Sequence, residues 1–369
     1  MKTTHFVPER GMTLVELMIA MTIGLLLLAG AASMFMTNKR IYQDIGDLGA
    51  LQENGRFALE LMLNDLRMAG HPGCSDDIGA AENRLNSASG TTDVLNFKFA
   101  IEGSESGANW QPSGNSTNII PTLGGSANGN LVSGTDAITV RYLDPVIVND
   151  TRTVLRANMT TVADNLPISN RTALTTNDLL AVSDCDGADI FQVTAVNDPD
   201  TTPNNGNETL SHAVGTAGTP PAAPNNASNN LSRTYSLGAQ IARYVVRRYF
   251  VGRDTSGSSL YWETPTSVGS PQVLVSGVNN MQILYGKDTD GDGIANSYLT
   301  ASAVGAAAEW DKIVDIKLAL LIATPNQNGS LATDTGTYNL LGTVVGPYND
   351  QRRRRIYTST IQIRNRIKS

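Results

Sequence analysis

The fold of this chain is decided by the stretch Arg10-Gly11-Met12-Thr13-Leu14-Val15-Glu16, which joins a basic residue and a glycine to a long apolar run. Glu16 is the one charged residue between Met12 and Met36. A helix of about 25 residues spans roughly 37 Å at ~1.5 Å per residue, and a hydrocarbon layer is about 30 Å thick. The run therefore predicts a membrane-spanning helix over residues 12–36.

The position of Gly11 separates this segment from an ordinary signal peptide. A secretory signal peptide has its small-residue cleavage site after the apolar core, whereas Gly11 precedes the apolar run. This order resembles the leader of type IV prepilins, which a dedicated prepilin peptidase cuts after the glycine. The resemblance implies a leader over residues 1–11 and an N-methylated Met12 as the first mature residue, although the family more often has Phe there.

Glu16 is the polar group that a membrane segment must accommodate. An ionised carboxylate near the bilayer centre costs about 2.5–3.5 kcal/mol on insertion scales, so a lone one marks a functional position. The resemblance to pilins implies that Glu16 pairs with the N-terminal ammonium of a neighbouring subunit, which is an assembly role. The alternative is a solvated carboxylate at the membrane interface, because Glu16 lies near the start of the run.

The helical pattern continues beyond the membrane, and residues 37–70 are expected to form an amphipathic extension of the same helix. Its expected apolar stripe consists of Leu48, Leu51, Gly55, Ala58, Leu59, Met62, Leu66 and Ala69. Gly70, Pro72 and Gly73 are typical of a helix end. Residues 52–59 and 65–70 resemble the signature of PilW-type minor pilins, and residues 285–298 and 361–366 resemble that family more loosely.

Residues 71–369 are expected to form a β-rich globular domain with an antiparallel sheet that packs on the helical stripe, an α+β fold. In a pilin this is the lollipop-shaped architecture. The expected strands are 136–143, 179–183, 190–196, 240–252, 260–263, 272–284, 312–323 and 356–366. The stretches 103–134 and 197–232 are polar and rich in turn residues, so they are expected to be long surface loops.

The two cysteines, Cys74 and Cys185, both follow the membrane segment. In an oxidising periplasm thiols tend to pair, so one disulfide is expected. It would close a loop of roughly 110 residues and stabilise the fold by about 4–5 kcal/mol. Two buried thiols or an intermolecular bond are the alternatives. A zinc site is not expected, because no C-x-x-C pair occurs and the histidines are scattered.

An Asp-rich stretch resembles the short calcium loops of extracellular modules. Its candidate ligands are Asp288, Asp290, Asp292, Ile294 and Asn296, at positions 1, 3, 5, 7 and 9 of a calcium-type loop. Gly293 occupies position 6, but Leu299 stands where an EF-hand has a glutamate. The pattern therefore indicates a structural Ca²⁺, and no cofactor is expected to be required. The alternative is a turn in which Asp and Gly satisfy backbone groups.

The charge of the chain limits its partners. A formal net charge of −7 argues against nucleic acid as a primary partner. The basic run over residues 352–355 is compatible with solvated strand arginines, with an acidic neighbouring subunit or with DNA. No G-x-S-x-G, H-E-x-x-H or P-loop motif is present, so the chain is not expected to be an enzyme.

The resemblance as a whole implies a minor pilin of a type IV pilus. It implies residence in the inner membrane with a periplasmic domain, and later an extracellular position in the fibre. The implied partners are prepilin peptidase, membrane lipid, other minor pilins, the major pilin and a PilY-family tip adhesin. The implied roles are initiation of pilus assembly, adhesion, twitching motility and DNA uptake. A J-type minor pseudopilin of type II secretion and a membrane-anchored adhesin are the alternatives; an anchored hydrolase lacks a recognisable site.

Overall fold

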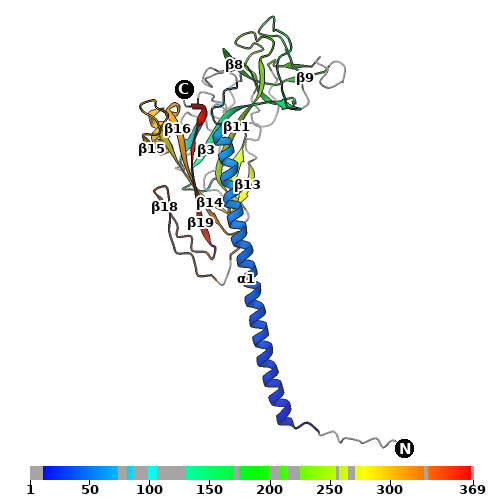
Figure 1. Cartoon of the computed structure of the whole chain (residues 1–369), viewed down its shortest axis with the longest axis vertical. Coiled ribbons are helices and arrows are strands. Elements are labelled where there is room, and N and C mark those ends of the chain that lie inside the picture. The colour runs from blue at the N-terminus through cyan, green and yellow to red at the C-terminus, as the bar shows by residue number, and fades with distance from the viewer. Residues whose placement is uncertain are drawn as a thin grey trace, which may run out of the picture. The chain divides into compact units, whose positions relative to one another are not determined.

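The structure is a computed structural model (Figure 1). It describes residues 11–73, 81–85, 99–105, 130–169, 174–198, 208–214, 225–254, 257–264, 271–327 and 331–366. The chain divides into two compact units, Met1–Ala50 and Leu51–Ser369. The second unit holds the β-rich domain together with the last turns of the long helix, so every packing contact described below lies within it.

Helix α1, Leu14–Met68, contains 55 residues and confirms the expected single helix. Its N-terminal part is long and apolar enough to cross a membrane, and none of that apolar window is buried by the rest of the chain. The helix ends just before Gly70, whose φ of +74° lies in the left-handed region that glycine adopts without strain.

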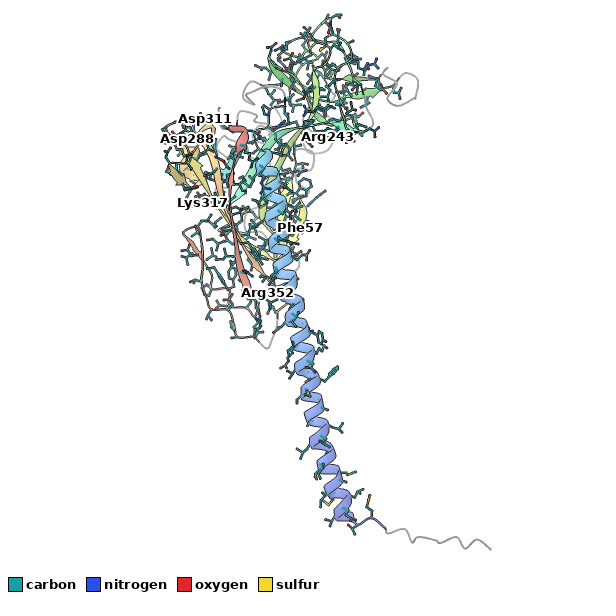
Figure 2. All side chains as sticks on the ribbon, in the orientation of Figure 1. Phe57, Arg243, Asp288, Asp311, Lys317 and Arg352 are labelled. Atoms are coloured by element: carbon teal, nitrogen blue, oxygen red, sulfur yellow. The ribbon has the colours of Figure 1, made fainter. Side chains whose placement is uncertain are left out.

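The C-terminal part of α1 presents the predicted stripe to the domain. Its buried residues are Leu51, Gly55, Ala58, Met62, Asp65 and Leu66. A Cβ atom on Gly55 would lie 2.3 Å from the ring of Tyr357, so glycine allows the helix to approach strand β19, Arg354–Gln362, closely. Phe57, on the opposite side, is 49% exposed (Figure 2).

The larger sheet has eight strands, and all of its pairs are antiparallel except β1 with β8. Its main path is β1 (Ala81–Asn83), β8 (Gly187–Gln192), β7 (Leu179–Asp184), β11 (Gln240–Asp254), β12 (Gly257–Glu263) and β13 (Gln272–Ser276). Strand β3 (Ala137–Pro145) also pairs with β11, and β2 (Ile101–Ser104) pairs with β3. The long strand β11 is therefore the centre of this sheet.

The second sheet has four antiparallel strands in the order β15 (Ser297–Leu299), β14 (Val278–Lys287), β16 (Ile313–Ala323) and β19. The smaller elements are β4 (Ile147–Val148), β5 (Thr151–Arg152), β6 (Leu166–Pro167), β9 (Ala195–Asn197), β10 (Thr209–Ser211), α2 (Ala301–Ala307), η2 (Trp310–Lys312), β17 (Tyr338–Leu340), β18 (Thr343–Val345) and η3 (Arg364–Arg366). An α+β class with a long N-terminal helix and antiparallel sheets is confirmed.

The main core lies between the α1 stripe and residues from both sheets, and it includes Met62, Leu66, Tyr249 and Leu318. A second core forms around β6, β9 and β10, with Leu166, Phe191 and Leu210 at its centre. A third cluster joins Ala319 and Leu321 of β16 to Leu340 of the β17–β18 hairpin. Strand β16 is thus covered on both faces over its second half, although its sequence alternation predicted one buried face.

Several predicted strand boundaries were wrong. The 272–284 run is two strands, because Gly277 turns the chain with a φ of +83° and lies against the Ala323 carbonyl. The 190–196 run divides between β8 and β9, and the last strand ends at Gln362 before the η3 turn. In each case the apolar pattern continues across a backbone break, so periodicity alone cannot locate it.

The prediction that residues 103–134 and 197–232 form surface loops was wrong in part. Residues 103 and 104 belong to β2, and residues 209–211 form β10. Glu208, His212 and Asn226 are buried although they are polar. Asn226 satisfies its side chain by accepting from the Gln192 N–H and donating to the Gln192 and His212 carbonyls. Residues 106–129, 199–207 and 215–224 of these stretches lie outside the described residues.

Candidate functional site

The start of α1 is closed by a reciprocal pair of side chains. The Glu16 Oε2 atom accepts hydrogen bonds from the Thr13 N–H and the Thr13 hydroxyl, both at 2.9 Å. The Glu16 N–H donates to Thr13 Oγ1 at 3.3 Å, and the Leu17 N–H donates to the Thr13 carbonyl at 3.2 Å. This geometry is a capping box, which satisfies backbone donors that a helix N-terminus leaves unpaired.

The capping role of Glu16 was missed at the sequence level, although the Thr-x-x-Glu spacing was visible. One carboxylate oxygen, Oε1, forms no hydrogen bond with any residue that the structure describes. The single chain leaves three predicted site residues exposed: Gly11, Met12 and Glu16. The expected cleavage position between Gly11 and Met12 is therefore exposed, and one Glu16 oxygen has no hydrogen bond among the described residues. Residues 1–10 of the expected leader lie outside the described residues.

The apolar surface of α1 that follows Glu16 is uncovered. Its exposed large apolar side chains include Leu14, Val15, Leu17, Met18, Ile19, Met21, Ile23, Leu25, Leu26, Leu27, Leu28, Met34, Phe35 and Met36. A contiguous exposed apolar surface of this length requires a lipid or protein environment. The helix can be covered by a bilayer or by the corresponding helices of other subunits.

The Asp-rich stretch forms the connection between the strands β14 and β15. The Asp288 carboxylate accepts hydrogen bonds from the N–H groups of Asp290, Gly291 and Gly293, at 3.1, 2.7 and 2.8 Å. These bonds, those from Gly291 and Gly293 foremost, lower the pKa of Asp288. The structure brings Asp288, Asp290 and Asp292 together, with one oxygen of each within 4.8 Å of the others.

The remaining predicted calcium ligands have other contacts. The Asn296 side-chain oxygen accepts from the Thr289 N–H at 2.7 Å, and its amide donates to Asp290 at 3.2 Å. The Ile294 N–H donates to Asp292 at 2.7 Å. The loop therefore satisfies much of its own hydrogen bonding, while three carboxylates remain close enough to share one cation.

Two family models match the chain. One, described as Type IV Pilus-assembly protein W, matches residues 248–365, and the other, a prokaryotic N-terminal methylation motif, matches residues 8–32. The chain is PilW-like. Neither the search of curated proteins nor the search of solved structures found a match.

The two matches place the PilW-like features at both ends of the described structure. The first covers the end of β11, the whole second sheet, the Asp-rich loop and the β17–β18 hairpin. The second contains Gly11 and Glu16. Residues 52–70, which carried the first resemblance to PilW-type proteins, lie outside both matches, as does the second core around β6, β9 and β10.

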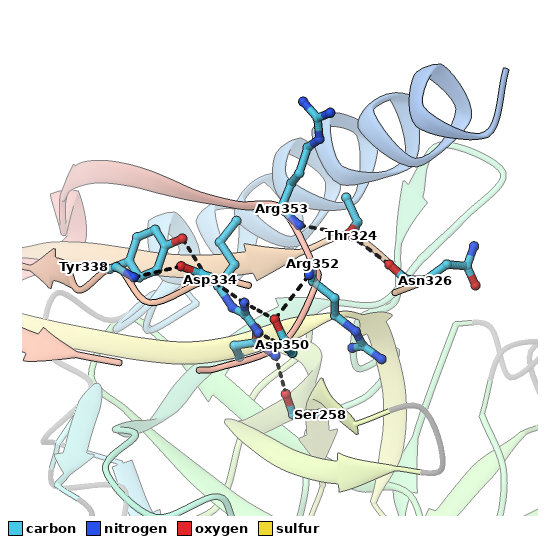
Figure 3. A network of polar contacts seen from close by, with 11 residues as sticks. Ser258, Thr324, Asn326, Asp334, Tyr338, Asp350, Arg352 and Arg353 are labelled. Carbon is cyan, nitrogen blue, oxygen red and sulfur yellow. Dashed lines mark hydrogen bonds and ion pairs between the residues drawn. The ribbon is translucent and has the colours of Figure 1, made fainter. Parts of the chain in front are cut away.

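The basic run of the PilW-like chain has an internal role that the sequence did not reveal. The Arg354 side chain is 2% exposed and donates to Asp334 at 2.7 Å, to Asp350 at 2.6 Å and to Asn279 at 2.9 Å. Its guanidinium also lies 3.9 Å from the centre of the Tyr348 ring. Arg354 is therefore neither a solvated strand arginine nor available to DNA. Figure 3 shows polar contacts of its partners Asp334 and Asp350.

Asp65 of the PilW-like chain is a second residue that sequence reasoning missed. It is 4% exposed and lies in the buried stripe of α1. Its carboxylate accepts from Tyr142 at 2.9 Å, from Arg247 at 2.8 Å and from the Tyr249 hydroxyl. A carboxylate at the helical spacing of an apolar stripe was the available signal. This cluster fastens the helix to strands β3 and β11.

The predicted disulfide of the PilW-like chain stays a prediction. Cys185 is exposed at the turn between β7 and β8, and Cys74 lies outside the described residues. A Cβ atom on the neighbouring Gly73 would lie 3.0 Å from the Ser183 hydroxyl oxygen. Gly73 therefore lies beside Ser183 of β7.

Proposed function

We propose that this PilW-like protein is processed after Gly11 by a prepilin peptidase and is incorporated into a type IV pilus as a minor subunit. The observation that carries the proposal is the combination at the N-terminus: the matched methylation motif, the exposed Gly11–Met12 junction and the uncovered apolar surface of α1. The PilW match over 248–365 supports the pilus as the destination. The protein acts as a structural subunit rather than as an enzyme.

The assembly role belongs to Glu16. We expect its carboxylate to pair with the N-terminal ammonium of a neighbouring subunit, because a carboxylate within an apolar bundle needs a positive partner. The oxygen that the Thr13 cap leaves unused can accept this contact while the cap remains intact. Lipid covers the helix before assembly, and neighbouring helices cover it afterwards.

The Asp-rich loop is proposed to hold a structural Ca²⁺. Oxygen ligands lie about 2.3–2.6 Å from Ca²⁺, so two ligands on opposite sides of one ion are roughly 4.6–5.2 Å apart. The oxygens of Asp288, Asp290 and Asp292 lie within 4.8 Å of one another, which fits that span. The ion would offset the repulsion among three carboxylates on one turn.

The finer roles rest on the resemblance to PilW-type proteins. We propose that the protein joins other minor pilins, the major pilin and a PilY-family adhesin in a priming complex, and thereby supports adhesion, twitching motility or DNA uptake. It would reside in the inner membrane with its domain in the periplasm, and later in the fibre. Loss of surface pili from a deletion strain would support this assignment. Normal pili with a defect in protein secretion would contradict it and favour a pseudopilin.

The experiment that tests processing is replacement of Gly11 by valine. We expect the Gly11→Val protein to accumulate as full-length precursor, because a side chain at the cut position obstructs the peptidase. Gly46→Val is the matched control, since a Cβ atom on Gly46 would meet no other atom within 4 Å and this glycine lies outside the leader. Normal cleavage of Gly11→Val, read by mass spectrometry of the membrane fraction, would refute the leader assignment.

A further inference from the structure

An acid-lined pocket of about 230 Å³ lies within the second unit, where β14 meets the β17–β18 hairpin. Its lining residues include the acidic residues Glu105 and Asp136, the half-buried Leu341, and the hydroxyl residues Thr300 and Thr343. No Lys, Arg or His belongs to the lining that the structure describes. The pocket therefore combines two carboxyl groups with an apolar side chain.

Asp136 is a buried carboxylate whose hydrogen bonding is incomplete. Its side chain accepts from the Ile283 N–H at 2.8 Å, and the residue is 7% exposed. Within the described part of the chain it has no ion pair and no second side-chain hydrogen bond. Burial, with a smaller contribution from the Glu105 charge, raises the pKa of Asp136 to about 7. One side of this carboxylate is thus left to the pocket.

Glu105 is held in place but not neutralised. It accepts hydrogen bonds from the Ser302 hydroxyl at 3.0 Å and from the Ser302 N–H at 3.4 Å, at the start of α2. The nearby Glu102 differs, because it is paired with Arg141 at 3.0 Å.

Burial and the charges of Asp136, Glu105 and Glu102 raise the pKa of Tyr285 well above its ordinary value. The Tyr285 hydroxyl has no hydrogen-bond partner among the described residues.

The adjoining sequence offers no compensating charge. Residues 106–129, which follow Glu105 directly and lie outside the described residues, contain no Lys, Arg or His. A buried carboxylate is costly unless it is paired or hydrogen-bonded. The pocket lining that the structure describes and residues 106–129 thus supply no positive partner for Asp136 and Glu105.

We propose that the pocket binds a primary ammonium group on a short aliphatic stem, with Asp136 and Glu105 contacting the ammonium and Leu341 contacting the stem. An ammonium supplies three donors, which suits two carboxylates and neighbouring hydroxyl oxygens. The volume lies below the roughly 300–1,000 Å³ of sites for drug-sized ligands, so a small amine or a lysine side chain fits. This binding goes beyond the proposed pilus function and does not depend on it.

The test is calorimetric titration of the purified full chain in detergent micelles with n-butylammonium chloride. At pH 8, above the pKa of about 7, Asp136 is ionised and we expect saturable binding. The neutral analogue 1-butanol is the matched probe and should bind at least about tenfold more weakly, since a charge-assisted pair contributes more than about 1.4 kcal/mol. The same measurement on detergent alone corrects for partition into micelles.

Two variants and one control connect the binding to the pocket. Asp136→Asn keeps an acceptor for the Ile283 N–H, and Glu105→Gln keeps acceptors for Ser302; each should weaken n-butylammonium binding at least about tenfold. Glu53→Gln removes an exposed carboxylate on α1 and should leave binding unchanged. Glu105→Gln serves alone if Asp136→Asn does not fold, as judged by its thermal unfolding curve.

The titrations have outcomes that contradict the proposal and outcomes that identify the source of the ammonium. Absence of saturable binding, equal binding of 1-butanol, or full binding by the folded variants would overturn the proposal. Tighter binding of Nα-acetyl-lysine amide than of butane-1,4-diamine would identify a lysine side chain of another subunit as the source of the ammonium. The reverse order would identify a free diamine. None of these measurements uses leader cleavage or pili. A negative result in the titrations therefore leaves the proposed pilus function intact, and a negative result in the cleavage or pilus experiments leaves the proposed ammonium site intact.

Discussion

Glu16 caps its own helix, and its proposed second role is to supply a charge to a neighbouring subunit. Glu16→Gln separates them, because the amide oxygen still accepts from Thr13 while the negative charge is lost. We expect Glu16→Gln to be cleaved and inserted normally but to be absent from sheared pili, as measured by immunoblotting.

The matched control for this prediction is Thr13→Val, which removes the two hydrogen bonds of the Thr13 hydroxyl, keeps the bond from the residue-13 N–H to Glu16 and keeps the charge. It should weaken the helix start by about 1 kcal/mol and leave incorporation largely intact. If Glu16→Gln enters pili as efficiently as the unmodified chain, the charge has no role in assembly.

Asp65 is the residue on which the docking of α1 depends most. Asp65→Leu leaves Arg247 and two tyrosine hydroxyls without their acceptor, so we expect a loss of roughly 2–4 kcal/mol in the free energy of unfolding. The Arg247 side chain is 34% exposed, so solvent screens its ion pair with Asp65 and the loss can lie in the lower part of that range. Urea unfolding followed by tryptophan fluorescence measures the loss.

Glu60→Gln, an exposed change on the same helix, is the control for Asp65→Leu. It should alter the free energy of unfolding by less than about 0.5 kcal/mol. Equal midpoints for Asp65→Leu and the unmodified chain would show that the cluster contributes nothing to the docking of the helix.

Sequence reasoning at this scale found residues with a strong local signal and missed those whose partners are remote. Gly11 and Glu16 stand out because their neighbours in the chain are apolar. The partners of Asp65 and Arg354 are distant or belong to loops without a motif. A charged residue inside an apolar stripe indicates that a partner exists, but the spacing does not say which one.

The connection between β14 and β15 is the element whose role depends on an ion. If the loop holds Ca²⁺, millimolar calcium should raise the thermal unfolding midpoint of the full chain, because a ligand that binds the folded state alone stabilises it. Asp290→Asn removes one negative charge while keeping an acceptor for Asn296, and it should reduce the shift.

Magnesium at the same concentration is the control for ionic strength in this experiment. It is expected to have less effect, because Mg²⁺ demands octahedral geometry and gives up its waters reluctantly. An unfolding midpoint that does not respond to calcium would leave the loop as a self-bonded turn.

Helices and strands were predictable from the sequence where one face is buried and the other is exposed to solvent. The stripe of α1 and the strands β3, β7, β11, β12 and β16 follow from periodicity within a few residues. The second face of β16 was not foreseen, because the hairpin that covers it around Leu340 is short and polar at its ends. Coverage by a distant hairpin is a tertiary effect that leaves no periodic signal in the strand.

On the scale of the whole molecule, the second core shows where composition misleads. Residues 208–214 and 225–232 are polar enough to suggest a loop, yet Leu210, Asn226 and Leu231 are buried. Polar groups enter this core because each is hydrogen-bonded, as Asn226 is to Gln192 and His212. Composition counts polar residues but does not register whether they are paired.

A disulfide between Cys74 and Cys185 would connect the end of α1 to the β7–β8 turn. We expect a non-reducing peptide map of protein from the periplasmic face to contain this cross-link. Cys185→Ser should lower the free energy of unfolding by about 4–5 kcal/mol in the chain-entropy account of a loop of this length.

Ser183→Ala, beside the expected bridge, is the control for Cys185→Ser. Alkylation of both cysteines without reductant would exclude the disulfide. A map with Cys185 joined to a second copy of the chain would point instead to an intermolecular bond.

The contact between Gly55 and Tyr357 has a consequence for biosynthesis. The Tyr357 hydroxyl donates to the Leu51 carbonyl at 3.2 Å across a separation of 306 residues. During translation β19 is synthesised long after residues 51–55, so this part of the α1 stripe lacks its β19 contact until the intervening chain has been made. Until β19 is in place, the side chains around Gly55 form an exposed apolar surface, which favours association with other chains.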